Sequence, residues 1–169
     1  MAKKYSSPPD LAIELDAEYS ATLHTSLGDI TIEFLAAEAP ITTNNFLFLA
    51  KEGYYDGVIF HRIVPGFVIQ GGDPTGTGSG GPGYTFRDEL DGNGKYSRGM
   101  VAMANAGPST NGSQFFVCLG DLGLPHAYSI FGRVTDGMDV VDAIAALPTG
   151  SQDRPNKPPV INSVTVTGT

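Results

Sequence analysis

Apolar and polar residues alternate along much of this 169-residue chain, a pattern typical of β-strands with one buried face. Alternating apolar positions in 21–23 and 30–34 flank Leu27-Gly28-Asp29, which predicts a β-hairpin whose glycine supplies a positive φ. Segments 129–134 and 160–167 predict two more strands. The alternation therefore indicates a mainly β protein.

Two stretches with helical spacing interrupt this alternation. Pro40 suits the first turn of a helix, Phe46, Leu49 and Ala50 form its buried stripe, and Gly53 is placed to end it. We expect a second helix to be capped by Asp136 and stopped by Pro148. Its apolar stripe is Val140, Val141, Ile144 and Leu147.

Size and composition favour one domain with many turns. A chain of 169 residues can bury roughly 70% of its unfolded surface around one core. Trp is absent, whereas Gly and Pro are plentiful at 22 and 12 residues. We interpret residues 1–17 as an N-terminal extension that packs against a domain spanning residues 18–169. The single cysteine, Cys118, cannot form an internal disulfide, so the fold does not depend on an oxidising compartment.

The charge balance narrows the choice of partners and compartment. A net charge of -8 and a pI near 4.6 argue against nucleic acid or an anionic membrane as a main partner, because both require a basic face. Lys3 and Lys4 resemble the start of a signal peptide, but residues 5–10 are polar where an apolar run is needed. No stretch is long and apolar enough to suggest a transmembrane span. We therefore expect a cytoplasmic protein.

The stretch 60–73 sets a permanent cation, Arg62, among apolar residues without an obvious acidic partner. Segments 59–64 and 67–70 predict two short strands that are separated by Pro65-Gly66. Because side chains alternate along a strand, Val68 and Gln70 should lie on the same face. This places an apolar surface beside a polar amide and a guanidinium.

The stretch 100–116 completes this candidate site. The same alternation puts Gln114 and Phe116 on one face, while Phe115 and Val117 point to the core. The intervening loop at 105–113 is rich in Gly, Asn, Ser and Pro, which leaves backbone groups free to bind a ligand.

The predicted site is a shallow apolar cup with a polar rim and without a nucleophile paired to a base. Such a site suits a neutral, amide-like ligand, and proline within a peptide is the obvious candidate. The X-Pro bond rotates over a barrier of roughly 18–20 kcal/mol, in tens to hundreds of seconds. The cup consists of Phe67, Val68 and Phe116, ringed by Arg62, Gln70, Gln114 and the backbone near Asn105.

Two other kinds of site are only weakly indicated. Gly76, Gly78 and Gly81 fit a G-x-G-x-x-G pattern, but the strand-like residues 84–86 follow where a dinucleotide site needs a helix. His24, His61 and His126 lack the spacing of metal ligands, and His61 is interpreted as structural. We predict no cofactor and no metal.

Several motifs in a fixed order resemble the cyclophilin family of peptidyl-prolyl cis-trans isomerases, over about Tyr19 to the C-terminus. They are Phe60-His61-Arg62, Gly66-Phe67, Gln70-Gly71-Gly72-Asp73, Met103-Ala104-Asn105-Ala106-Gly107-Pro108, Asn111-Gly112-Ser113-Gln114-Phe115-Phe116 and Phe131-Gly132. The resemblance implies a closed eight-stranded antiparallel β-barrel with a helix over each opening. It also implies an isomerase that rotates X-Pro bonds and assists protein folding. Its substrates would be proline-containing peptides and unfolded or client proteins.

The resemblance assigns residues to roles. It implies that Phe67, Val68, Phe116 and Leu124 line the pocket for the proline ring. Arg62 would act on the peptide bond, Gln70 would contact a substrate carbonyl, and the Asn105 backbone would anchor the residue before proline. Ala104, Gln114 and Gly78 would border the groove, and the altered Tyr128 would lie on its rim.

The stretch 120–128 departs from the family pattern. Gly123 falls where many members have a Trp, Tyr128 falls where many have a His, and Val68 replaces a more usual Met. We therefore expect weakened binding of the inhibitor cyclosporin. We expect a monomer, and the main alternative is a module or chaperone that binds proline peptides without catalysis.

Overall fold

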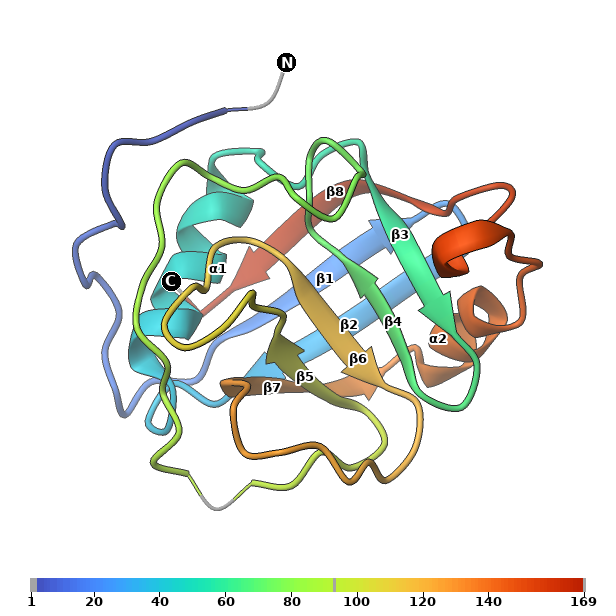
Figure 1. Ribbon diagram of the computed structural model, residues 1–169. Helices are drawn as coiled ribbons and strands as arrows, with labels where there is room; N and C mark the ends of the chain where they lie inside the picture. Colours follow the sequence, from blue (N-terminus) through green and yellow to red (C-terminus); the bar gives the residue numbers. More distant parts are fainter. Residues whose placement is uncertain (1–2, 93, 169) are drawn as a thin grey trace.

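Eight antiparallel strands close a barrel in the computed structural model, which describes residues 3–92 and 94–168 (Figure 1). Around the barrel the order is β1-β2-β7-β5-β6-β4-β3-β8, so the first and last strands of the chain pair with each other. The closed mainly β barrel with two helices confirms the predicted fold class. The strands are β1 Ser20–Thr25, β2 Gly28–Phe34, β3 Val58–Val64, β4 Val68–Gly71, β5 Met100–Met103, β6 Phe115–Cys118, β7 Ile130–Asp136 and β8 Val160–Thr167.

The predicted hairpin and the predicted first helix are both present. β1 and β2 are joined at Gly28, which has a φ of 135°. Helix α1, Pro40–Lys51, has its proline in the first turn, and the Gly53 N–H donates to the Ala50 carbonyl 3.1 Å away. Phe46 and Leu49 are fully buried on this helix, so its apolar stripe faces the barrel.

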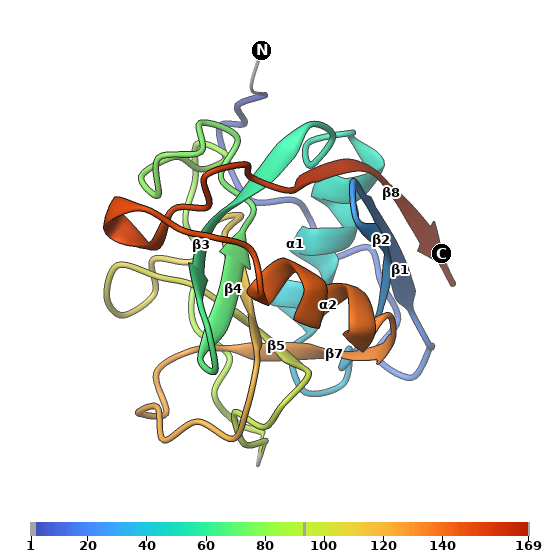
Figure 2. The ribbon, with the colours of Figure 1, turned by 90° about the vertical axis from the view of Figure 1, so that its right-hand side faces the viewer.

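The second helix begins in a different way from the prediction. Helix α2, Met138–Ala145, is preceded by Gly137 with a φ of 92°, whereas Asp136 is the last residue of β7 and pairs with Thr31. A Cβ atom on residue 137 would lie 2.2 Å from the Asp29 carbonyl oxygen, so a glycine is required there. The two helices lie at opposite ends of the barrel (Figures 1 and 2). A short 3₁₀ helix, Ser151–Asp153, precedes β8.

Strands β4, β5 and β6 carry apolar side chains on both faces. Their inner positions, such as Ile69, Phe115 and Val117, belong to the central core. Their outer positions form a second, smaller cluster on the outside of the barrel. This outer cluster consists of Val68, Tyr96, Ala102, Phe116, Cys118 and Ile130. Burial raises the pKa of the Cys118 thiol to about 12.

Some predicted segments lie outside the described residues or differ from the expectation. Residues 1–2 of the predicted extension and residue 169 of the predicted domain are outside, as is residue 93. The strand-like stretch 84–86 is not a strand, because only Phe86 pairs, in an isolated bridge to Asn111. In the described part of the chain, no helix is long and apolar enough to cross a membrane.

Candidate functional site

A hollow of about 170 Å³ lies on the outer side of β3, β4 and β6, above the outer cluster. Because Arg62 of β3 pairs with Gln70 of β4, and Gln70 pairs with Phe116 of β6, three neighbouring strands contribute to its wall. We call this the Arg62 hollow. It is lined by Arg62, Phe67, Val68, Gln70, Ala104, Asn105, Phe116, Leu124 and Tyr128.

The polar side of the Arg62 hollow is a chain of hydrogen bonds. The Arg62 Nη1 donates to Gln70 Oε1 at 3.3 Å, and the Gln70 Nε2 donates to Gln114 Oε1 at 3.2 Å. The Arg62 Cζ lies 6.0 Å from the centre of the Phe67 ring, at the limit of a cation–π contact. Within residues 3–92 and 94–168, Arg62 forms no ion pair with a carboxylate. The guanidinium therefore remains a charged donor beside the hollow.

A second, larger hollow of about 450 Å³ adjoins the first. Gln70, Ala104 and Asn105 line both hollows. We call the second the glycine-loop hollow, because residues 78–82 form one of its walls. The Gln114 Nε2 donates to the carbonyls of Gly78 at 2.9 Å and Gly80 at 3.1 Å, which ties the loop to the barrel. All eleven predicted site residues thus lie along two adjoining hollows.

The stretch 120–128, which departs from the family pattern, contributes Leu124 and Tyr128 to the rim of the Arg62 hollow. The Tyr128 ring meets Phe116 edge-on, with 5.7 Å between ring centres. Asn105 holds this stretch, since its Nδ2 donates to the Ala127 carbonyl at 2.9 Å. Gly123 is exposed and has open space around it, so its position adds no wall to the hollow.

Tyr96 is a supporting residue that the sequence interpretation missed. Its hydroxyl donates to the Tyr128 carbonyl at 2.7 Å and accepts from the Tyr128 N–H at 3.1 Å. Tyr96 is 32 residues from Tyr128 and lies outside the quoted motifs, so no local signal pointed to it. Burial, ahead of every other influence, raises the pKa of its hydroxyl.

Asp73 organises the glycine loop and was also missed. Its Oδ1 accepts from the Thr75 N–H and hydroxyl, both at 2.8 Å, and its Oδ2 accepts from the N–H groups of Gly78 and Gly80 at 2.7 and 3.0 Å. Burial acts to raise its pKa, but the hydrogen bonds from Gly80, Thr75 and Gly78 outweigh it and lower the pKa to about 2. An aspartate followed by Thr and Gly residues is a local signal for such a turn.

His61 lies beneath the glycine loop, where the Gly78 Cβ position would be 3.7 Å from His61 Nε2. The ring is buried, and within the described residues its Nδ1 has no hydrogen-bond partner. Burial is the main cause that lowers its pKa, assisted by the charges of Arg154 and Arg62 and opposed by Asp73. The other two histidines make hydrogen bonds nearer the surface, His24 to Asp29 and Thr165 and His126 to the Leu90 carbonyl.

Comparison with protein families gives one match across most of the chain. Residues 20–166 match the family described as "Cyclophilin type peptidyl-prolyl cis-trans isomerase/CLD". A relative from Mycobacterium leprae, "Probable peptidyl-prolyl cis-trans isomerase A", is 46% identical over 87% of this chain and 91% of its own. An Arabidopsis thaliana relative, "Peptidyl-prolyl cis-trans isomerase CYP18-1", is 49% identical over 87% of this chain and 95% of its own.

Solved structures agree with this match. A cyclophilin type peptidyl-prolyl cis-trans isomerase from Cryptosporidium parvum superposes with a TM-score of 0.85 at 37% identity, over 90% of this chain and 99% of its own. A second structure of that protein, in the presence of the dipeptide Ala-Pro, gives a TM-score of 0.84 at 38% identity, over 89% and 99% of the two chains.

Proposed function

The chain belongs to the cyclophilin-type peptidyl-prolyl cis-trans isomerases, and on that premise we propose how its two hollows catalyse rotation of X-Pro bonds. The isomerase activity is what its relatives are named for. The observation that carries the mechanism is the Arg62 guanidinium, which borders an apolar hollow and is free of carboxylates in the described part of the chain.

Arg62 stabilises the twisted peptide bond. Rotation breaks the amide resonance and turns the planar proline nitrogen into a pyramidal atom with a lone pair. Only the transition state offers this acceptor, so a guanidinium that donates to it binds the transition state better than either ground state. The hydrogen bond from Nη1 to Gln70 holds the guanidinium in place for this role.

One hydrogen bond does not account for the whole acceleration. Shortening the exchange from about a minute to about a millisecond requires the barrier to fall by about 6 kcal/mol. A charged hydrogen bond contributes about 1.5–3 kcal/mol. The rest comes from holding the proline ring on Phe67, Phe116 and Leu124 and from excluding the water that stabilises the planar amide.

The remaining site residues orient the peptide around the ring. Gln70 contacts a substrate carbonyl, and the Asn105 backbone anchors the residue before proline. Ala104, Gln114 and Gly78 border the path of the chain along the glycine-loop hollow. Val68 forms the floor and Tyr128 the rim of the ring pocket.

The physiological role follows from the kind of bond that is rotated. We propose that the protein assists the folding of proline-containing client proteins, as a cytoplasmic monomer. Open space at Gly123 supports the proposal that cyclosporin binds weakly, because no large side chain closes that rim. Calorimetry can compare the affinity of the wild-type protein for cyclosporin with that of the variant Gly123→Trp.

The decisive experiment is NMR exchange spectroscopy on an Ala-Pro peptide. The protein should accelerate exchange, and Arg62→Ala should lose about 10- to 100-fold of that acceleration, which corresponds to 1.5–3 kcal/mol. The circular dichroism spectrum of the variant should stay unchanged. Peptide binding without acceleration would instead favour a non-catalytic module, and a bell-shaped dependence on pH would implicate a titrating group such as His61.

A further inference from the structure

The N-terminal extension lies outside the family match at residues 20–166, yet it touches the wall of the glycine-loop hollow. The Tyr5 N–H donates to the Pro82 carbonyl at 2.8 Å, and the Lys4 Nζ donates to the Gly81 carbonyl at 2.6 Å. Gly81 and Pro82 both line that hollow. The extension therefore supports the wall from behind.

A glycine makes this close approach possible. Gly83 has a φ of 99°, and a Cβ atom on it would lie 2.5 Å from the Tyr5 carbonyl oxygen. Any larger residue at position 83 would push the extension away from the wall. The glycine at position 83 therefore permits the contact between the extension and the wall.

Tyr5 is anchored in turn on helix α1. Its ring meets Phe48 edge-on, with 5.1 Å between ring centres, and its hydroxyl lies 3.4 Å from the Glu52 Oε1. Lys3 donates to the Glu52 carbonyl. Because α1 packs into the barrel, the extension links the loop wall to a rigid element.

The wall is also tied to α1 and to the loop before β6. Tyr84 donates its hydroxyl to Asn45 Oδ1, and Asn45 Nδ2 donates to the Gly112 carbonyl at 2.8 Å. Pro82 packs on Gly112, where a Cβ atom would lie 3.0 Å from the proline Cδ. Residues 81–84 are therefore held both by the extension and by contacts with Asn45 and Gly112.

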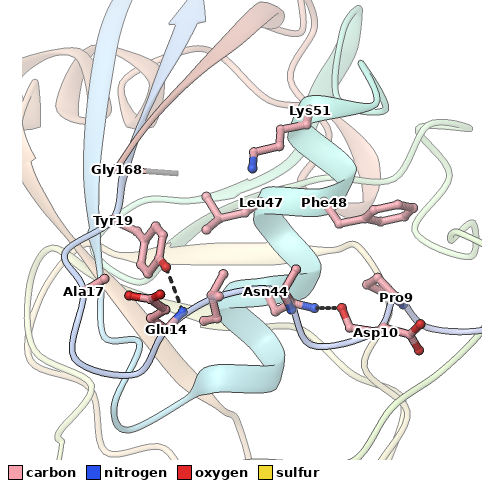
Figure 3. A pocket seen from close by; sticks show the side chains of 12 residues that line it. Pro9, Asp10, Glu14, Ala17, Tyr19, Asn44, Leu47, Phe48, Lys51 and Gly168 are labelled. Carbon is pink, nitrogen blue, oxygen red and sulfur yellow. Dashed lines mark hydrogen bonds between the residues drawn. The ribbon is translucent and has the colours of Figure 1, made fainter.

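A separate set of bonds holds the rest of the extension, as Figure 3 shows. Asn44 accepts from the Ala12 N–H at 2.9 Å and donates to the Asp10 carbonyl at 3.0 Å. The Tyr19 hydroxyl accepts from the Glu14 N–H at 2.8 Å. This part encloses a different cavity of about 500 Å³ against α1. The bonds of Asn44 and Tyr19 are thus separate from the contacts of Tyr5 with the wall.

We propose that Lys4 and Tyr5 are positioning residues that fix the wall of the glycine-loop hollow and so set the affinity for the substrate residues that precede proline. This inference rests on the proposed function. Asn105 lines both hollows. In the proposed function, its backbone binds the substrate residue that precedes proline. The chain that precedes this amino acid therefore enters the glycine-loop hollow. Lys4 and Tyr5 act through the loop and do not touch the reacting bond.

The test compares two peptides and three variants. One peptide is acetyl-Ala-Pro-amide, which reaches only the Arg62 hollow, and the other has three residues before the proline. Tyr5→Ala should raise the KM for the long peptide about three- to tenfold, with kcat unchanged, because uniform binding is lost. The short peptide should be isomerised as by the wild type. Tyr5→Phe, which keeps the ring on Phe48, should restore the KM, and Leu11→Ala, at an exposed leucine of the extension, should change nothing.

The outcomes separate this inference from the proposed function. An unchanged KM for the long peptide, or an equal loss for both peptides, would overturn the role of the extension while wild-type isomerisation still stood. Wild-type protein that accelerates neither peptide would overturn both. Deletion of residues 1–7 provides a second variant should Tyr5→Ala fold poorly, and it should show the same split between the peptides.

Discussion

Strands β4 and β6 place apolar residues alternately on their inner and outer faces, but the two faces have different surroundings. On the inner face, Ile69, Phe115 and Val117 are fully buried in the barrel. On the outer face, Val68 and Phe116 belong to the smaller outer cluster, and the residues packed against it, such as Phe67, are only half-buried. Inside, the helices and the opposite strands complete the packing. Outside, loops cover this cluster only in part and leave the Arg62 hollow open, so the same apolar alternation produces a concave surface there.

The two faces are also held by different forces. Aromatic contacts dominate the interior, where Phe46 stacks on Tyr55 with 4.8 Å between ring centres. The outer face depends on hydrogen bonds that hold its loops, above all those of Asp73 and Gln114. We therefore expect substitutions inside to cost the most stability, and substitutions outside to cost less and to change function or the pH dependence of stability.

The largest effect should come from Phe115→Ala on the inner face. Its ring makes edge-on contacts with Phe46, Tyr55 and Phe60, all within the core. Removing a fully buried ring costs about 3–5 kcal/mol of stability. Urea denaturation should show this as a lower midpoint with an unchanged slope. A loss below about 1 kcal/mol would contradict the distinction between the two faces.

A smaller effect, sensitive to pH, is expected for Asp73→Asn. An amide at position 73 would turn a donor toward N–H groups that now bond to a carboxylate, at a cost of about 1.5–3 kcal/mol near neutral pH. Because folding lowers the pKa of Asp73 from 3.8 to about 2, its contribution is complete above pH 4 and is lost between about pH 4 and 2. In thermal melts, the difference in stability between the wild type and Asp73→Asn should become smaller as the pH falls over that range. A gap independent of pH would sink this explanation.

The smallest change in free energy should follow Phe67→Ala on the outer face. The ring is half-buried, so we expect less than about 1 kcal/mol of destabilisation. It also forms one side of the Arg62 hollow, and kcat/KM for an Ala-Pro peptide should fall about tenfold, or about 1.4 kcal/mol. If urea denaturation showed a loss of stability as large as the loss of activity, Phe67 would be an ordinary part of the core.

Local patterns in the sequence predicted much of this arrangement. Alternation alone separated Phe115 from Phe116, and the bounds predicted for the last strand, 160–167, are those of β8. The cap of α2 was wrong for a physical reason. Asp136 looked like a cap, but the close approach of the Asp29 carbonyl requires glycine at position 137, and that approach depends on two strands far apart in sequence.

Long-range contacts could not be predicted in the same way. Tyr5 and Pro82 are 77 residues apart, and no pattern in the residues around Tyr5 indicates its partner. Likewise, Tyr96 supports Tyr128 through a bond between two loops. The family resemblance picked out residues that line the two hollows, whereas the residues that support them were visible only in the folded chain.

Cys118 is fully buried and burial raises the pKa of its thiol, so we expect it to react slowly with thiol reagents at neutral pH. A cysteine introduced at an exposed position would then be the one reactive thiol. A fluorophore or spin label attached at position 11 would then report whether the extension stays bound to α1, without first removing a native side chain from the outer cluster.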